Sequence, residues 1–366
     1  MKNRVLINYC YIVFMMLGAW FSAATPAQEI SLTKIHDDGT YNAFTDLAKF
    51  QGQYYCTFRS AISHGGAGHD VLGEIVVIRS SDTKQWSEVA RFSSVGVDLR
   101  DPKLLVTPTD IRVYAVDCRL RPKGAIQYAN CAWTSIDGTT WSDSQPMAPG
   151  YIFWRPKMNQ GKFYVPAYVR RPGYCGVDVL VSDDGYDWHV QSTPIPPTTV
   201  KGETLWANET EILFLENGKA LLFARRNYTG TPNPELAKYG GFRSGIVLQS
   251  DAATLTQWEV LDESLYFHCP AAIEHNGRIF LAGRDKLELD DGRVTETGRL
   301  WEFVAGKGFA EIQHLKTHGD SSYMGIVAEG DALLVSYYST HEGETAYFEK
   351  PGKADIYLSR VRIVEE

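Results

Sequence analysis

Short apolar runs separated by polar turns extend along most of the chain, and segments with helical periodicity are nearly absent. Three of these runs share one pattern, in which an arginine follows a turn glycine by seven residues. They are QGQYYCTFR, NGKALLFAR and NGRIFLAGR, and they end at Arg59, Arg225 and Arg284. Each predicts a tight turn followed by a strand that carries the arginine at its end.

Related segments occupy the same place in three further repeats. A looser copy, QGKFYVPAYVRR, ends at Arg170 and Arg171, and TDIRVYAVDCRL and EGDALLVSYYST fill the remaining places. A first strand precedes each turn, and the six are expected to begin near Thr45, Arg100, Arg155, Glu209, Pro270 and Tyr323. Four short strands that repeat about every 55 residues are typical of a β-propeller. We therefore expect an all-β, six-bladed β-propeller with four-stranded antiparallel blades.

The turn after the third strand of several repeats has a recurrent composition. SSDTKQW, SIDGTTW and SDDGYDW end at Trp86, Trp141 and Trp188, and SDAATLTQW is a decayed copy. These turns resemble the Asp box of the sialidase superfamily, in which the aspartate caps backbone amides and the tryptophan packs between sheets. We expect them to be structural. Either the N-terminal ISLTKIHDD or the C-terminal DIYLSRVRIVEE is expected to close the ring.

The N-terminus predicts export. Lys2 and Arg4 precede an apolar run, and small residues follow around Ala24 and Ala27, as in a secretory signal peptide. We assign residues 1–27 to this signal and residues 28–366 to a single propeller domain. No other segment is long enough to span a membrane, so a periplasmic or extracellular location is expected.

The amino-acid composition limits the classes of partner that the protein is expected to bind. The net charge is −8 and no block of lysine and arginine occurs, so nucleic acid is not an expected partner. The chain has 20 Tyr, 16 Phe and 9 Trp, which suits a β-rich fold and also a glycan-binding surface. A glycan or glycoconjugate is the expected partner, and the oligomeric state is left open.

Cysteine and histidine spacing gives no metal motif. Beyond the signal, the cysteines are Cys56, Cys118, Cys131, Cys175 and Cys269, with no C-x-x-C pair. Cys118 and Cys131 flank a predicted hairpin and are compatible with a disulfide or with two free thiols. His64, His69 and His341 match no known ligand spacing, so no metal or other cofactor is expected.

The topology of a blade brings the polar residues to one face. First strands start and second strands end on the face opposite the tryptophan turns. That face collects Glu209 and Tyr323, the three arginines, and the loop residues Asp70, His341 and Glu342. Three arginines directed at one central well predict a site for an acidic ligand, because guanidinium groups bind carboxylates in pairs of hydrogen bonds. The alternative is that each arginine pairs with a local carboxylate, as Arg225 would with Glu209.

The order of these residues resembles an exo-sialidase over nearly the whole predicted mature chain. The family pattern of arginine, aspartate, glutamate, arginine, arginine and tyrosine is met by Arg59, Asp70, Glu209, Arg225, Arg284 and Tyr323. The resemblance implies a retaining hydrolase of terminal sialic acids. It implies Tyr323 as nucleophile, Glu209 as its base and Asp70 as acid and base, with the arginines binding the substrate carboxylate.

The sequence departs from the exo-sialidase pattern at several positions, so alternative site residues and functions remain open. Arg59 is followed by Ser-Ala, where the family usually has Ile-Pro. Arg293 or Arg299 could replace Arg284, and Glu211 could replace Glu209. Arg100, Asp101, His341 and Glu342 are further candidates for substrate binding, and Arg100-Asp101-Pro102 also resembles a motif of five-bladed glycosidases that use paired carboxylates. A neutral-sugar glycosidase, a uronate lyase and a non-catalytic glycan-binding propeller therefore remain alternatives.

Overall fold

The computed structural model describes most of the predicted domain. It covers residues 28–65, 71–120, 126–169, 176–196, 198–200, 203–228, 243–288, 294–342 and 352–363. The predicted signal peptide, Asp70, His69, Arg170, Arg171, Cys175 and Arg293 lie outside the described residues. Within these ranges every regular element is a β-strand. No helix there is long and apolar enough to cross a membrane.

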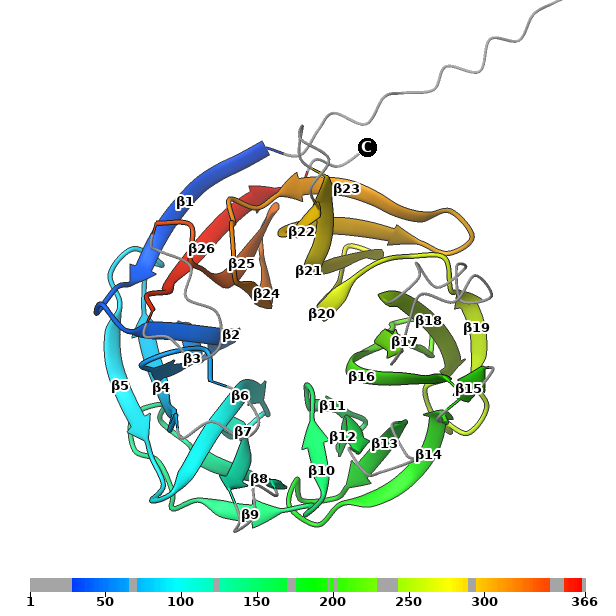
Figure 1. The fold of residues 1–366 in the computed structure, drawn as a ribbon, viewed down its shortest axis with the longest axis horizontal. Coiled ribbons are helices and arrows are strands. Elements are labelled where there is room, and N and C mark those ends of the chain that lie inside the picture. The colour runs from blue at the N-terminus through cyan, green and yellow to red at the C-terminus, as the bar shows by residue number, and fades with distance from the viewer. Residues whose placement is uncertain are drawn as a thin grey trace, which may run out of the picture.

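Six antiparallel sheets surround a central axis, which confirms the predicted six-bladed propeller (Figure 1). The innermost strands, in blade order, are β2 (Tyr41–Phe50), β6 (Val97–Val106), β10 (Tyr151–Phe153) with β11 (Lys157–Asn159), β16 (Glu203–Phe214), β20 (His268–His275) and β24 (Ser321–Glu329). The second strands are β3 (Gln53–Ala61), β7 (Ile111–Leu120), β12 (Lys162–Val169), β17 (Lys219–Tyr228), β21 (Arg278–Glu288) and β25 (Ala332–Ser339).

The outer strands complete each blade. The third strands are β4 (Glu74–Ser80), β8 (Ile126–Ser135), β13 (Val177–Ser182), β18 (Arg243–Asp251), β22 (Val294–Val304) and β26 (Asp355–Arg362). The fourth are β5 (Ser87–Phe92), β9 (Gln145–Met147), β14 (His189–Ile195), β19 (Glu259–Asp262), β23 (Gly308–His314) and β1 (Gln28–His36). A short strand, β15 (Thr198–Val200), pairs with β16 in the fourth blade.

Both ends of the domain close the ring, rather than one or the other. β1 pairs with β26 in the sheet that also contains β24 and β25 (Figure 1). The first and last strands in the sequence therefore lie side by side in the sixth blade. Apolar side chains of facing sheets fill the spaces between blades, and every residue of β25 is buried because the inner strands are covered on both faces.

The predicted hairpins form as expected. Gly52, Gly218 and Gly277 have φ values of 76°, 82° and 70°, the left-handed conformation that glycine adopts without strain. In the turns between third and fourth strands, the predicted capping by aspartate is also present. Asp82 and Asp184 each accept two backbone N–H groups through Oδ1, from residues 84 and 85 and from residues 186 and 187.

The innermost strands of five blades contain a β-bulge, which corrects the predicted strand starts. β2 begins at Tyr41 rather than near Thr45, and its pairing with β3 passes directly from Ala43 to Asp46. The equivalent break occurs in β6, β16, β20 and β24. The positions predicted as starts in these strands therefore lie at or beside bulges.

These bulges bring side chains from different blades together. Phe44, Asp101, Cys269 and Tyr323 have φ values of 64°, 50°, 53° and 49°. A bulge re-aims a side chain relative to a regular strand. As a result the rings of Phe44 and Tyr323, from the first and last blades, have centroids 4.7 Å apart. Left-handed backbone at a non-glycine residue costs on the order of 1–3 kcal/mol, and such conformations cluster at functional sites.

Candidate active site

Tyr323 and Glu209 form the centre of the site. The Tyr323 hydroxyl donates a hydrogen bond of 2.8 Å to Oε1 of Glu209. The other carboxylate oxygen, Oε2, accepts from Arg225 at 2.8 Å and from the Cys269 thiol at 3.1 Å. Glu209 is 4% exposed, so three blades supply donors to one buried carboxylate. Glu211 does not take this place, because it pairs with Arg155 and Lys157.

Burial and nearby charges determine the protonation states of Glu209 and Tyr323. Burial raises the pKa of Glu209, but the guanidinium group of Arg225 outweighs this and holds the pKa at about 2. Burial raises the pKa of Tyr323 well above its ordinary value, and the negative charges of Asp101 and Glu209 add to the effect. At neutral pH the pair is therefore a carboxylate and a neutral phenol, and the phenol needs a base to become a nucleophile.

Arg59 and Arg100 form a second cationic group around Asp98. Arg59 is fully buried and donates from Nε to Asp98 at 2.8 Å and from Nη1 to the Ser63 carbonyl at 3.0 Å. Arg100 donates to the other oxygen of Asp98 at 2.9 Å. Burial and the nearby Arg100 both lower the pKa of Arg59. Asp98 thus accepts hydrogen bonds from both guanidinium groups, and the charge of Asp101 acts on both as well.

Arg284 is the third arginine near the centre. It is 8% exposed and pairs with Glu296 at 3.3 Å. Its charge acts on Glu209 and Arg225, which places it beside the central pair. Arg299 instead pairs with Asp285 at 2.8 Å and with Glu311.

All three predicted arginines therefore have a carboxylate partner, as the alternative interpretation expected. The partners of Arg59, Arg225 and Arg284 are Asp98, Glu209 and Glu296. Two donor groups nevertheless have no hydrogen-bond partner within the described residues, namely Nη2 of Arg59 and Nε of Arg284. Local pairing thus leaves one hydrogen-bond donor group available on Arg59 and one on Arg284.

Asp101 and Lys103 lie beside the central pair and come from the second bulge. The Oδ1 atom of Asp101 is buried without a hydrogen-bond partner in the described part of the chain. Burial raises the pKa of this carboxyl group, while Arg100 and Lys103 oppose the rise. Lys103 is 1% exposed, and its ammonium nitrogen lies 4.5 Å from the Trp154 ring centroid and 5.2 Å from that of Tyr323.

The sequence pattern does not predict the buried hydrogen-bond network around Asp320. Asp320 is 1% exposed and accepts hydrogen bonds from Tyr41 and, at 2.9 Å, from Tyr338, and it contacts the His64 ring. Burial raises its pKa, but His64 and Tyr41 hold the value at about 2. The His64 ring also packs edge-on against Phe44. The only sequence signal was the position of Asp320 three residues before Tyr323.

Two predicted loop residues, His341 and Glu342, have partners outside the central pair. His341 packs against Tyr357 of β26, with ring centroids 4.6 Å apart, and Glu342 pairs with Lys34 of β1 at 2.9 Å. No interaction within the described ranges joins either residue to the central pair. Among the described residues no group of three or more His, Cys, Asp or Glu side chains is arranged to hold a metal. Cys118 and Cys131 are free thiols, since Cys131 faces Ala115 and Cys118 faces Tyr128.

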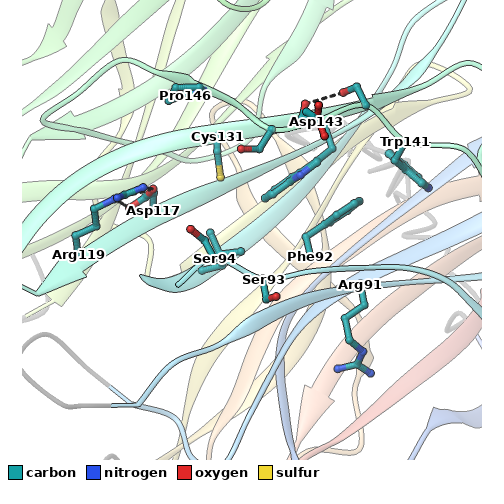
Figure 2. A pocket seen from close by; sticks show the side chains of 14 residues that line it. Arg91, Phe92, Ser93, Ser94, Asp117, Arg119, Cys131, Trp141, Asp143 and Pro146 are labelled. Atoms are coloured by element: carbon teal, nitrogen blue, oxygen red, sulfur yellow. Dashed lines mark hydrogen bonds and ion pairs between the residues drawn. The ribbon is translucent and has the colours of Figure 1, made fainter. Parts of the chain in front are cut away.

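One described cavity of about 490 Å³ lies away from the central pair (Figure 2). It is bounded by the end of β5 and by β8 and β9, and its lining includes Phe92, Asp117, Arg119 and Trp141. None of the central residues lines it. Tyr323, Glu209 and the arginines instead mark the site through their burial and mutual contacts, and chemistry rather than cavity size identifies it.

No protein-family model and no curated protein sequence matches the chain. Solved structures do share its fold. Trypanosoma rangeli sialidase in complex with sialic acid has a TM-score of 0.63 at 12% identity, over 93% of this chain and 58% of that chain. Phage phi92 endosialidase has a TM-score of 0.59 at 11% identity, over 92% of this chain and 69% of that chain.

A third solved structure broadens the comparison. Penicillium chrysogenum α-L-arabinanase complexed with arabinobiose has a TM-score of 0.60 at 15% identity, over 92% of this chain and 98% of that chain. The chain spans less than two thirds of the trypanosomal sialidase but nearly all of the arabinanase. The fold is thus the propeller that sialidases and an arabinanase share, and fold alone does not select the substrate.

Proposed function

We propose that the chain is an exported exo-glycoside hydrolase that removes a terminal acidic sugar, sialic acid or a close relative, from a glycan. The observation that carries the proposal is the contact of Tyr323 with Glu209, itself held by Arg225. A hydroxyl nucleophile beside a base, with a third group orienting that base, is the arrangement that covalent catalysis requires. Sialidases are a tyrosine exception among glycosidases.

The charge of the substrate explains the choice of tyrosine. The anomeric carbon of a sialoside carries a carboxylate, and an attacking aspartate or glutamate would bring a second negative charge to it. A neutral phenol avoids this repulsion until the proton leaves. Arg59, Arg225 and Arg284 would bind the substrate carboxylate and hold it as positive charge develops on the sugar ring.

The reaction has two steps. In the first, Tyr323 Oη bonds to the anomeric carbon, its proton passes to Glu209 Oε1, and the leaving oxygen takes a proton from Asp70 as the glycosidic bond breaks. In the second, Asp70 takes a proton from water, whose oxygen bonds to the anomeric carbon. The bond to Tyr323 breaks, and Glu209 returns its proton to the phenol oxygen. The role of Asp70 rests on its position in the sequence.

The basicity of Glu209 depends on its pairing with Arg225. Arg225 holds this carboxylate ionised and weakly basic, with a pKa of about 2. A substrate carboxylate that binds Arg225 would compete for the guanidinium group and add negative charge next to Glu209. Both effects raise the pKa of Glu209. The base therefore becomes effective when an acidic substrate is bound, which favours acidic over neutral sugars.

A neutral-sugar glycosidase is the second candidate, and Asp101 favours it. This carboxyl group has a raised pKa, to which burial and the negative charge of Glu209 contribute, and a buried oxygen without a hydrogen-bond partner among the described residues. A protonated carboxyl group and an ionised one on either side of a sugar are the arrangement of most glycosidases. In that reaction Asp101 would be the acid and Glu209 the nucleophile.

The deciding experiment is turnover of chromogenic glycosides by the wild type, with sialosides, uronides and arabinosides in one panel. We expect cleavage of a sialoside, and loss of at least about a thousandfold in kcat for Tyr323→Phe, equal to about 4 kcal/mol of transition-state stabilisation. The variant keeps the ring, so its melting temperature should change little. Near wild-type turnover by Tyr323→Phe would make this tyrosine a packing residue.

Two other outcomes of the glycoside panel would favour an alternative function. Cleavage of neutral sugars only, abolished by Asp101→Asn but not by Tyr323→Phe, would replace the proposal with the second candidate. Binding of acidic sugars without any turnover would identify a glycan-binding propeller.

The predicted signal peptide, residues 1–27, supports export to the periplasm or the extracellular space. N-terminal sequencing of the mature protein tests export, and an intact Met1 would contradict it.

A further inference from the structure

Lys103 carries an ammonium group in the interior of the propeller and is 1% exposed. Within the described part of the chain its hydrogen bonds go to the carbonyl oxygens of Pro102 at 3.1 Å and Asp101 at 3.4 Å. No carboxylate of the described residues forms an ion pair with it. Burying a charge without a partner costs several kcal/mol. A buried lysine in this state therefore calls for a compensating role.

Two of the three carboxylates that act on Lys103 are engaged with other groups. Asp46 accepts hydrogen bonds from the backbone N–H groups of Leu47 and Leu104 and from Arg155. Glu209 accepts from Tyr323 and Arg225, as described above. Asp101, the third carboxylate, acts on Lys103 through its charge but forms no ion pair with it among the described residues, and the ammonium nitrogen lies 5.2 Å from the ring centroid of Tyr323.

The ammonium group lies over two neighbouring aromatic rings. Its nitrogen is 4.5 Å from the Trp154 centroid and 5.2 Å from the Tyr323 centroid, and the two rings are themselves 5.1 Å apart. A cation within about 6 Å of a ring face is attracted to the ring, by roughly 2 kcal/mol or more where water is excluded. The attraction grows when the ring becomes a phenolate, because the ring then carries a full negative charge.

We infer that Lys103 is a positioning residue for the reaction, whose ammonium group stabilises the negative charge that Tyr323 acquires when its proton passes to Glu209. This inference rests on the proposed function, because Tyr323 must be the nucleophile. The charge exists only between proton transfer and formation of the bond to the anomeric carbon. An interaction that strengthens at that stage lowers the barrier rather than the substrate affinity.

The groups that face Lys103 make its charge sensitive to pH. Burial lowers the pKa of Lys103 to about 8, and the cation of Arg155 contributes to the decrease. The carboxylates of Asp101, Asp46 and Glu209 act in the opposite direction. Above pH 8 the ammonium group loses its proton, so the stabilisation of the phenolate is lost on the alkaline side.

The test compares pH profiles of kcat for the wild type, Lys103→Met and Lys103→Arg, on the glycoside that the wild type cleaves. Methionine keeps the volume and removes the charge, and we expect kcat at pH 7 to fall tenfold to a hundredfold with KM nearly unchanged. The decline of wild-type activity near pH 8 should disappear in Lys103→Met. Lys103→Arg keeps a permanent charge and should retain activity above pH 8.

The matched control is Lys49→Met. Lys49 also lies over a tyrosine ring, 4.8 Å from the centroid of Tyr54, but it is on the far part of β2 and takes no part in the site. Its removal should leave the profile unchanged. An active Lys103→Met variant with the wild-type profile would overturn the inference and leave the proposed function intact. A wild type that cleaves no glycoside would overturn the proposed function and this inference with it.

Discussion

At the scale of single residues, Arg225 has two roles that a substitution can separate from folding. It holds Glu209 ionised, and it is one of the arginines expected to bind the substrate carboxylate. Charge-assisted hydrogen bonds contribute about 1.5–3 kcal/mol. Arg225→Ala should therefore raise KM for an acidic glycoside about tenfold to a hundredfold and change KM for a neutral one little, measured by steady-state kinetics.

The neighbouring arginine is the control. Arg226 is buried, and it pairs with Glu263 of the outer part of the blade and with the Gly245 carbonyl. Arg226→Ala should reduce stability without changing the ratio of KM values for acidic and neutral substrates. Equal losses on both substrates for Arg225→Ala would show that this arginine serves the fold alone.

Lys103 leads to a prediction about stability. Its pKa in the folded protein is about 8, below the ordinary 10.5. Below pH 8 both the folded and the unfolded state carry the proton, and the folded state bears the full cost of burying the charge. Between pH 8 and 10.5 the folded state loses the proton first, so stability rises with pH. Lys103→Met should increase the free energy of unfolding by up to about 3 kcal/mol below pH 8.

Urea denaturation at pH 7 and pH 9.5 measures this effect. The gain from Lys103→Met should be smaller at pH 9.5, because the wild type is then largely relieved of the charge. A variant that is less stable than the wild type at pH 7 would assign Lys103 a structural role in holding the carbonyls of the bulge.

The sequence predicted some site residues and missed others for definite reasons. Arg59, Arg225 and Arg284 were found because a turn glycine fixes their position on the second strand of each hairpin. Lys103 was missed because a single lysine in an apolar strand usually points to solvent. Asp320 was missed because its partners, Tyr41, Tyr338 and His64, come from distant segments and only the folded ring brings them together.

At the scale of elements, the innermost strands decide the geometry of the site. Alternating apolar positions and turn glycines predicted the strands and their order. The bulges left no such signal, since left-handed positions are normally marked by glycine or asparagine, and here Phe44, Asp101, Cys269 and Tyr323 occupy them. The predicted strand starts were wrong by a few residues for this reason. The shift in strand pairing at each bulge nevertheless explains why side chains of different blades come into contact.

Close packing of one innermost strand against the next gives a test at this scale. Gly325 of β24 lies against β2, where a Cβ atom would overlap the backbone of Leu47 and Asp46. Backbone cannot move aside as a side chain can. Gly325→Ala should therefore lower the free energy of unfolding by about 3 kcal/mol or more, measured by urea denaturation.

Gly330 in the same blade provides the comparison. It has a φ of 59°, but the space around a Cβ atom there is open. Gly330→Ala should cost about 1 kcal/mol, from backbone strain alone. Similar losses in the free energy of unfolding for Gly325→Ala and Gly330→Ala would mean that β24 and β2 do not pack closely at Gly325.

At the scale of the whole molecule, the ring holds every site residue in place because the sixth blade contains both ends of the domain. Tyr323 lies on β24 of this blade, whereas Phe44 and Glu209 come from other blades. Opening the ring between β26 and β1 would leave the sheet of Tyr323 intact but expose its outer edge. Unpaired edges are sites of aggregation. The sequence predicted closure by one terminus or the other, since either segment alone reads as a strand.

The last prediction follows from this closure. A chain that begins at residue 37 lacks β1, which pairs with β26 from Gln28↔Arg362 to His36↔Ile356. It should melt more than about 10 °C below a chain that begins at residue 28, since a loss of 1 kcal/mol shifts the melting temperature by about 2–4 °C in large domains. A peptide of residues 28–36 added in trans should restore part of the difference, and a scrambled peptide should not. Equal melting temperatures for the two chains would show that β1 covers the sheet without closing the ring, and the positions of Tyr323 and Glu209 would then depend on the inner strands alone.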